Sequence, residues 1–150
     1  MASSHFTASV CNRPVAEVEA EFSASTIHGA DLRFHGVVRD IEEGLPLAGI
    51  EYSHYEAMAL NELNRIGKAM ARDFPEHHAL VHHVVGYVPA GEASILIRVQ
   101  SAHSAEAFEI CREYLKRIKT TVPIWKEAVF EGGRRPDDFA PKEDHIDHNS

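Results

Sequence analysis

Several features are scarce in this 150-residue chain, and each scarcity excludes a class of protein. Only two cysteines are present, Cys11 and Cys111, which excludes a disulfide-stapled fold and favours a reducing compartment. The longest apolar runs, such as residues 95–97, are far too short to cross a bilayer. Residues 1–14 hold no apolar segment of signal-peptide length. We therefore expect a cytoplasmic protein with no membrane partner.

Positive charge is also scarce, with 15 lysines and arginines against 23 acids and a net charge of −8. A broad nucleic-acid-binding surface needs net positive charge facing phosphates, so we expect no nucleic-acid partner. The cations nevertheless concentrate between Arg98 and Arg135, where eight of them stand against five acids. This local excess suits one small anionic ligand.

Glycine-rich phosphate loops are absent, since the chain has neither a GxGxxG nor a Walker-type sequence. Histidine, by contrast, is abundant, with 11 residues that include the pattern HHxxxHH at 77–83. A zinc site needs three or four converging ligands, whereas neighbours on a strand point to opposite faces. We therefore predict surface histidines and no metal. An acidic adaptor whose histidines bind a metal is the alternative.

Hydrophobic periodicity predicts an α+β fold with a mixed, mostly antiparallel sheet, two long helices and a short N-terminal helix. Helices are predicted over 14–22, over 60–74 and from a cap at Ser104. Strands are predicted over 31–39, 49–54, 79–88, 94–100 and 124–130, with turns over 40–46 and 89–92.

No repeat or linker divides the chain, so we predict a single domain over residues 1–135. Residues 136–150 are acidic and polar, and we predict that they form a flexible tail. Cys111 lies on the apolar stripe of the second long helix, which favours a packed core thiol over a nucleophile.

Four cationic or imidazole side chains stand at the ends of predicted elements. Arg39 ends a strand, where a guanidinium can hold a phosphate or carboxylate in a bidentate manner. His103 precedes a helix, where free backbone N–H groups favour an anion. Lys119 and Lys126 flank a turn at Pro123, so they can converge on one anionic group. Each position also suits a solvated surface residue, and spacing alone does not decide.

Four segments in order along the chain resemble one family: FHGVVRD at 34–40, EYSHYEAMA at 51–59, SAHSAEAFE at 101–109 and YLKRIKTTVPIWKEA at 114–128. Over roughly residues 29–133, the chain resembles the large, catalytic subunit of molybdopterin synthase. The resemblance implies an α/β-hammerhead fold, in agreement with the predicted α+β pattern. It also implies a homodimer that binds two small subunits to give a heterotetramer.

The activity that the resemblance implies is sulfur transfer in molybdenum cofactor biosynthesis. A small ubiquitin-like subunit ends in Gly-Gly and carries sulfur as a C-terminal thiocarboxylate. Two sulfurs pass in succession to cyclic pyranopterin monophosphate, which becomes molybdopterin. The enzyme then needs no cofactor, because the partner supplies the sulfur.

The resemblance also implies site residues. Lys119 and Lys126 are implied as catalytic. The implied substrate contacts are Val37, Val38, Arg39, His103, Ser104, Lys119, Lys126, Glu127 and Ala128. Ser104 departs from the family, which usually has arginine there, and Arg112, Arg134 or Arg135 could supply the missing charge. This departure leaves open a non-catalytic paralogue that binds a pterin or a protein tail.

Overall fold

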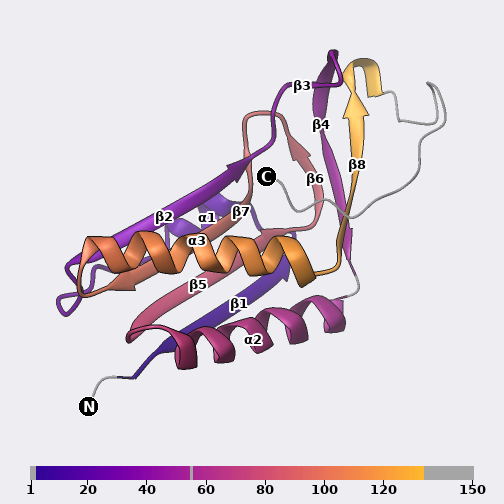
Figure 1. Cartoon of the computed structure of the whole chain (residues 1–150). Helices are drawn as coiled ribbons and strands as arrows, with labels where there is room; N and C mark the ends of the chain where they lie inside the picture. The colour runs from indigo at the N-terminus through magenta and orange to yellow at the C-terminus, as the bar shows by residue number, and fades with distance from the viewer. Residues whose placement is uncertain (1–2, 55, 134–150) are drawn as a thin grey trace.

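The computed structural model describes residues 3–54 and 56–133, in which strands and helices alternate along the chain (Figure 1). The elements in chain order are β1 (His5–Cys11), α1 (Val15–Glu19), β2 (Ala30–Val37), β3 (Ile41–Glu42), β4 (Leu45–His54), α2 (Glu56–Asp73), β5 (His77–Val84), β6 (Gly86–Pro89), β7 (Ala93–Ser101), α3 (Ser104–Thr121), β8 (Ile124–Phe130) and a 3₁₀ turn (Glu131–Gly133). The predicted tail, 136–150, lies outside the described residues, as do Arg134 and Arg135.

The larger sheet has the strand order β1-β5-β7-β2. The β1–β5 pair is parallel, and the other two pairs of this sheet are antiparallel. Helices α2 and α3 pack side by side over one face, and the short α1 lies against the other (Figure 1). The predicted α+β class, the mostly antiparallel pairing and the set of one short and two long helices are therefore confirmed.

The smaller sheet is centred on β4, which pairs antiparallel with β3, β6 and β8. Its strands stand at one end of the larger sheet, beyond the last turn of α3 (Figure 1). The β3–β4 hairpin turns at Glu43 and Gly44, which both have positive φ, as a two-residue type I′ turn requires. The predicted turn over 40–46 is thus the tip of this hairpin.

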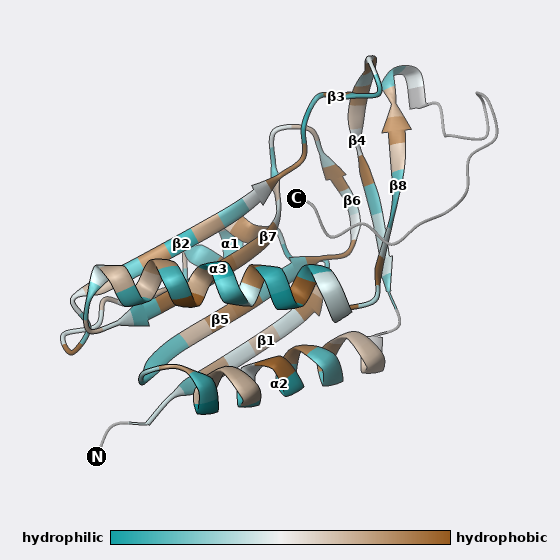
Figure 2. Ribbon diagram, viewed as in Figure 1, coloured by the Kyte–Doolittle hydropathy of each residue, from teal (hydrophilic) through white to brown (hydrophobic). Residues whose placement is uncertain are grey.

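The main core lies between the two long helices and the larger sheet. β7 is buried along almost its whole length, and α3 buries one residue every three or four, from Ala107 to Ile118. Both helices alternate between hydrophobic and hydrophilic residues (Figure 2), as expected for helices with one face on a sheet. Gly67 of α2 lets the helix approach β1, because a Cβ there would fall 2.4 Å from the Phe6 ring. None of the helices among the described residues is both long enough and apolar enough to cross a bilayer.

Three details differ from the sequence-based expectations. The single strand predicted over 79–88 is wrong, because the chain breaks at Gly86, with φ of 90°, and passes from the larger sheet into the smaller one. β1 was not predicted at all, since its small and polar residues give only a weak strand pattern. Ser104 is not the cap of α3: His103 has the extended N-cap conformation, and Ser104 is the first helical residue.

Candidate functional site

A pocket of about 560 Å³ opens where the end of β2 meets the smaller sheet. Its lining combines charged and apolar side chains: Val37, Val38, Arg39, Ile41, Glu42, Leu47, Ile50, Tyr52 and Lys126. The volume is within the range of small-molecule sites. Four of the residues implied by the family resemblance, Val37, Val38, Arg39 and Lys126, therefore share one pocket, although Lys126 follows the other three by about 90 residues in sequence.

Backbone hydrogen bonds hold the segment that carries Arg39. The N–H of Val38 donates to the carbonyl of Glu92 at 2.9 Å, and the carbonyl of Val38 accepts from the N–H of Gly91 at 2.8 Å. On the other side, the carbonyl of Asp40 accepts from the N–H of Leu47 at 2.8 Å. Arg39 is thus fixed between two anchored neighbours, and its exposed side chain reaches the pocket.

Lys126 reaches the pocket from β8, where it lies opposite Tyr52 of β4 in the antiparallel register. Tyr52 is only 3 % exposed and makes an edge-to-face contact with His83 at 5.0 Å between ring centroids. A bulge between Leu47 and Gly49 changes the alternation of β4, so that Leu47 lines the same pocket as Ile50. The pocket therefore has an apolar floor beneath its charged groups.

The next two implied contacts, Glu127 and Ala128, are not among the pocket-lining residues. Glu127 is exposed and pairs with Glu51, so strand alternation directs it to the face opposite Lys126. Ala128 shares the face of Lys126 and is 9 % exposed.

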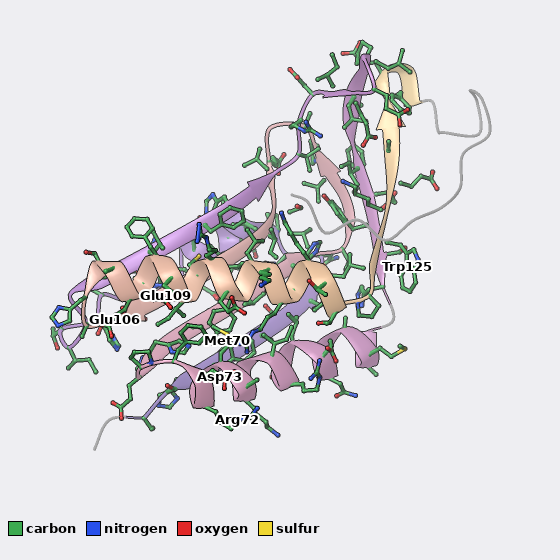
Figure 3. The ribbon with its side chains drawn as sticks, viewed as in Figure 1. Met70, Arg72, Asp73, Glu106, Glu109 and Trp125 are labelled. Carbon is green, nitrogen blue, oxygen red and sulfur yellow. The ribbon has the colours of Figure 1, made fainter. Side chains whose placement is uncertain are left out.

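His103 and Ser104 lie at the opposite end of α3 from the pocket. Both side chains are exposed, and the hydroxyl of Ser101 donates to the carbonyl of His103 at 2.9 Å. Figure 3 shows this separation: Glu106 marks the beginning of α3, and Trp125, next to Lys126, lies far from it at the start of β8. The structure therefore does not bring His103 and Lys126 together within one chain.

Lys119 lies in the last turn of α3 and is half-buried. It is not among the residues that line the pocket, but the chain passes directly from this turn through Pro123 into β8. About 22 Å of helix separates it from Ser104, at 1.5 Å per residue. Lys119 thus belongs to the Lys126 end of the molecule.

Two cations of the locally positive region have structural partners. Arg98 is 8 % exposed and forms a two-point ion pair with Asp31, whose pKa is lowered by these hydrogen bonds. Arg117 joins the two long helices by pairing with Glu113 at 3.0 Å and with Asp73 of α2 at 3.1 Å. The local positive charge inferred from the sequence is therefore only partly available to a ligand.

Glu42 is the charged pocket residue that the sequence analysis missed, and the uncharged ones it missed are Ile41, Leu47, Ile50 and Tyr52. Glu42 is the last residue of β3, directly before the type I′ turn, and its side chain is half-buried in the pocket. Within the described residues, neither Glu42 nor Arg39 forms a side-chain hydrogen bond or an ion pair. The acidic composition of 40–43 indicated only a loop, and no local signal distinguished Glu42 from its neighbours.

The prediction of surface histidines is wrong for three of them. His77, His82 and His83 are buried, and each has a hydrogen-bond partner. His77 Nε2 lies 2.8 Å from the hydroxyl of Tyr114, and His82 Nδ1 lies 2.7 Å from the hydroxyl of Ser9. Burial lowers the pKa of both imidazoles. Across residues 3–54 and 56–133, no group of three potential ligands has a geometry that could hold a metal.

The prediction of a core thiol is confirmed for Cys111. Its side chain is 6 % exposed on the sheet-facing stripe of α3, and burial raises its pKa to about 11. A thiol with so high a pKa carries little thiolate at neutral pH, so it is a poor nucleophile.

Comparison with known proteins supports this arrangement of the fold. A bovine molybdopterin synthase catalytic subunit is 38 % identical over 107 residues, which cover 71 % of this chain and 57 % of the bovine protein. The chain thus spans just over half the length of that relative. The structure of molybdopterin synthase from Staphylococcus aureus superposes with a TM-score of 0.75 at 30 % identity, covering 84 % of this chain and 93 % of that one.

A more distant fold neighbour was solved as a complex. The complex of subunits 1 and 2 of molybdopterin-converting factor from Helicobacter pylori matches with a TM-score of 0.68 at 20 % identity, covering 87 % of each chain. The sequence model of the MoaE protein family matches residues 11–121, most of the chain. This chain therefore belongs to the MoaE protein family, that of the molybdopterin synthase catalytic subunit.

Proposed function

We propose that this chain is the catalytic subunit of a molybdopterin synthase, a sulfurtransferase that converts cyclic pyranopterin monophosphate to molybdopterin. The observation that carries the proposal is the pocket in which Arg39 and Lys126 converge over an apolar floor. Two cations suit the phosphate of this substrate, and the apolar floor suits its fused rings. The two free cysteines suit the reducing cytoplasm, where we place the protein.

The sulfur donor we propose is the thiocarboxylate of a small ubiquitin-like subunit that ends in Gly-Gly. The Helicobacter pylori fold neighbour, which was solved with two subunits of molybdopterin-converting factor, supports an assembly of this kind. Each transfer forms a carbon–sulfur bond to the pterin side chain as a carbon–oxygen bond there breaks, and the oxygen leaves either on the opened phosphate ester or as water. Water then breaks the acyl–sulfur bond, and the tail leaves as a carboxylate. The partner supplies the sulfur, so the proposal includes no cofactor or metal.

Each cation has its own role in this proposal. Lys119 acts as the principal general acid or base facing the thiocarboxylate, and Lys126 positions the substrate and stabilises the charge that develops on the acyl group. Arg39 binds the phosphate from the opposite wall of the pocket. Val37 and Val38 supply the apolar part of that wall. Glu127 and Ala128 follow Lys126 and shape the adjoining part of β8.

His103 and Ser104 enter the proposal through a second copy of the chain. They lie about 22 Å from Lys119 along a straight helix, which is too far for one small substrate to bridge within a protomer. In a homodimer, the beginning of α3 from one protomer can complete the pocket of its partner. Two small subunits then give a heterotetramer with two shared sites.

The first experiment replaces Lys119 with alanine and measures molybdopterin formation with thiocarboxylated small subunit. The matched control is Lys116→Ala, on the same helix but exposed. We expect Lys119→Ala to lower turnover by at least about a hundredfold, as loss of an acid–base group does, and the control to stay near wild type. Near-normal turnover in a folded Lys119→Ala variant would refute its role.

A second experiment tests the shared site by mixing two inactive variants, Lys119→Ala and His103→Ala. Random exchange of protomers makes half of the dimers mixed, and each mixed dimer keeps one intact site. We therefore expect roughly a quarter of wild-type activity to return in the mixture. No recovery on mixing, with exchange verified by differently sized tags, contradicts a site shared between protomers.

Ser104 favours one alternative, a paralogue that binds the pterin or the tail without catalysis. Formation of molybdopterin distinguishes this paralogue from a synthase. A paralogue binds the precursor and the small subunit but forms no molybdopterin from them, whereas a synthase gives product under the same conditions.

A further inference from the structure

The pocket is lined by two cations, Arg39 and Lys126, and by one acid, Glu42. Binding of a phosphate accounts for the two cations but gives no role to the carboxylate. Arg39 and Glu42 both line the pocket, yet neither has a side-chain partner among the described residues, and they do not pair with each other. A carboxylate beside a bound phosphate would repel it. Glu42 is therefore suited to contact a different part of the ligand, one that donates hydrogen bonds to the carboxylate.

The hairpin holds Glu42 in place. Its backbone pairs with Leu45 across the two-residue turn, in which Glu43 has φ of 51° and Gly44 φ of 77°. A tight turn of this type leaves little freedom to the last strand residue before it. The backbone of Glu42 is thus fixed by a strand end and a short turn, so that its side chain enters the pocket from a regular element.

We infer that Glu42 recognises the aminopyrimidinone edge of the pterin, an inference that rests on the proposed function and assigns the substrate's orientation. This edge presents two parallel donors, the ring N3–H and the 2-amino group, which match the two oxygens of one carboxylate. The phosphate then lies toward Arg39 and Lys126. Leu47, Ile50 and Tyr52 lie beneath the ring system.

The apolar rim of the pocket fits a flat bicyclic ligand. Val37 at the end of β2 and Ile41 of β3 are large apolar side chains that line the pocket and are exposed to 43 % and 50 %. Bound rings would cover this apolar surface and exclude water from the hydrogen bonds to Glu42, which strengthens them.

The test compares two ligands that differ at this edge only. One is 6-hydroxymethylpterin phosphate. The other is the matching lumazine phosphate, which carries a carbonyl where the pterin has its 2-amino group. Titration calorimetry gives the ratio of the two affinities for wild type, for Glu42→Gln and for Glu43→Gln. Glu43 is the matched control because it makes the same charge change one residue away, outside the pocket.

We expect wild type to prefer the pterin by roughly tenfold or more, because a charged acceptor strengthens both hydrogen bonds. Glu42→Gln should bring the ratio to within about threefold of unity, and Glu43→Gln should keep the wild-type ratio. In the sulfur-transfer assay, Glu42→Gln should raise KM for the precursor with kcat nearly unchanged.

An unchanged pterin preference in Glu42→Gln overturns the assignment. The assignment also fails if that variant loses affinity for the small subunit instead, because Glu42 would then bind the protein tail. Neither result affects the proposed function, which fails only if wild type makes no molybdopterin from the precursor and charged small subunit. Thermal unfolding of Glu42→Gln at the wild-type midpoint verifies that the hairpin variant is folded.

Discussion

Lys126 of β8 lies directly opposite Tyr52 of β4, and both residues line the pocket that also receives Arg39 from the end of β2. This cross-strand pair places an ammonium group above a buried aromatic floor. The position of Lys126 is set by strand register, so it needs no flexible loop to reach a ligand.

Replacing Lys126 with alanine should lower the rate of sulfur transfer by about a hundredfold or more, because a preorganised charge at the reacting group is lost. Lys126→Arg keeps the charge but not the compact ammonium, so we expect only partial recovery. Molybdopterin formation at saturating precursor is the measurement. Equal rates for Lys126→Ala and wild type contradict a role for this lysine in the chemistry.

Ser104→Arg should tighten precursor binding, because it puts a guanidinium where the family usually has one. We expect KM for the precursor to fall by roughly tenfold, the value of a charge-assisted hydrogen bond to phosphate. Ala105→Arg is the control, since it adds the same charge at the adjacent exposed position. A similar fall in both variants indicates general attraction and leaves no specific role for position 104.

The buried imidazoles of His77 and His82 predict a loss of stability in mild acid. Burial lowers both pKa values below the ordinary 6.5, so the unfolded chain binds more protons than the folded one in that range. The free energy of unfolding should therefore fall as pH drops from about 6.5 toward the lowered pKa values, by up to about 1.4 kcal/mol per histidine per pH unit.

Urea unfolding at pH 7.5 and at pH 5.5 measures this effect. His77→Gln should be less stable than wild type at pH 7.5, since the bond to Tyr114 is altered, but it should lose less stability on acidification. The carboxylates with lowered pKa, such as Asp31, act only at lower pH and do not confuse the result. A free energy of unfolding that is equal at the two pH values contradicts the prediction.

Local patterns predicted most of the fold because most elements have a clear periodicity. The two long helices and the strand at β7 follow from apolar spacing and from breaks at Pro75 and Pro123. The strand predicted over 79–88 failed because β-branched residues stand on both sides of Gly86. Period-two spacing does not reveal that the chain leaves one sheet for another, and Gly86 was the only local sign of the break.

The candidate site was less accessible to local reasoning. Charge type and position at element ends identified Arg39 and Lys126 as candidates, but spacing did not indicate that they share a pocket. Arg39 and Lys126 share a pocket because β8 pairs with β4, and not with β7, the strand that precedes it in the chain. Glu42 was missed for the same reason: an acid in a loop has no distinctive local pattern, and only the hairpin turns it into the pocket.

Cys111 provides a direct test of whether sulfur rests on the protein during transfer. Its thiol is buried with a pKa of about 11, so only about a thousandth is thiolate at pH 8. Iodoacetamide should therefore modify the half-buried Cys11 long before Cys111 in the native protein, and both should react in urea. Mass spectrometry of tryptic peptides follows the two sites.

Because the partner's tail carries the sulfur in the proposed function, Cys111→Ala should keep wild-type turnover per folded molecule. Its free energy of unfolding should fall by about 1 kcal/mol because the substitution leaves a small cavity. Loss of turnover without loss of folded protein would instead mean that the Cys111 thiol takes part in the transfer, for example by displacing hydrosulfide from the thiocarboxylate to form an acyl thioester, and the donor chemistry would need to be reassigned.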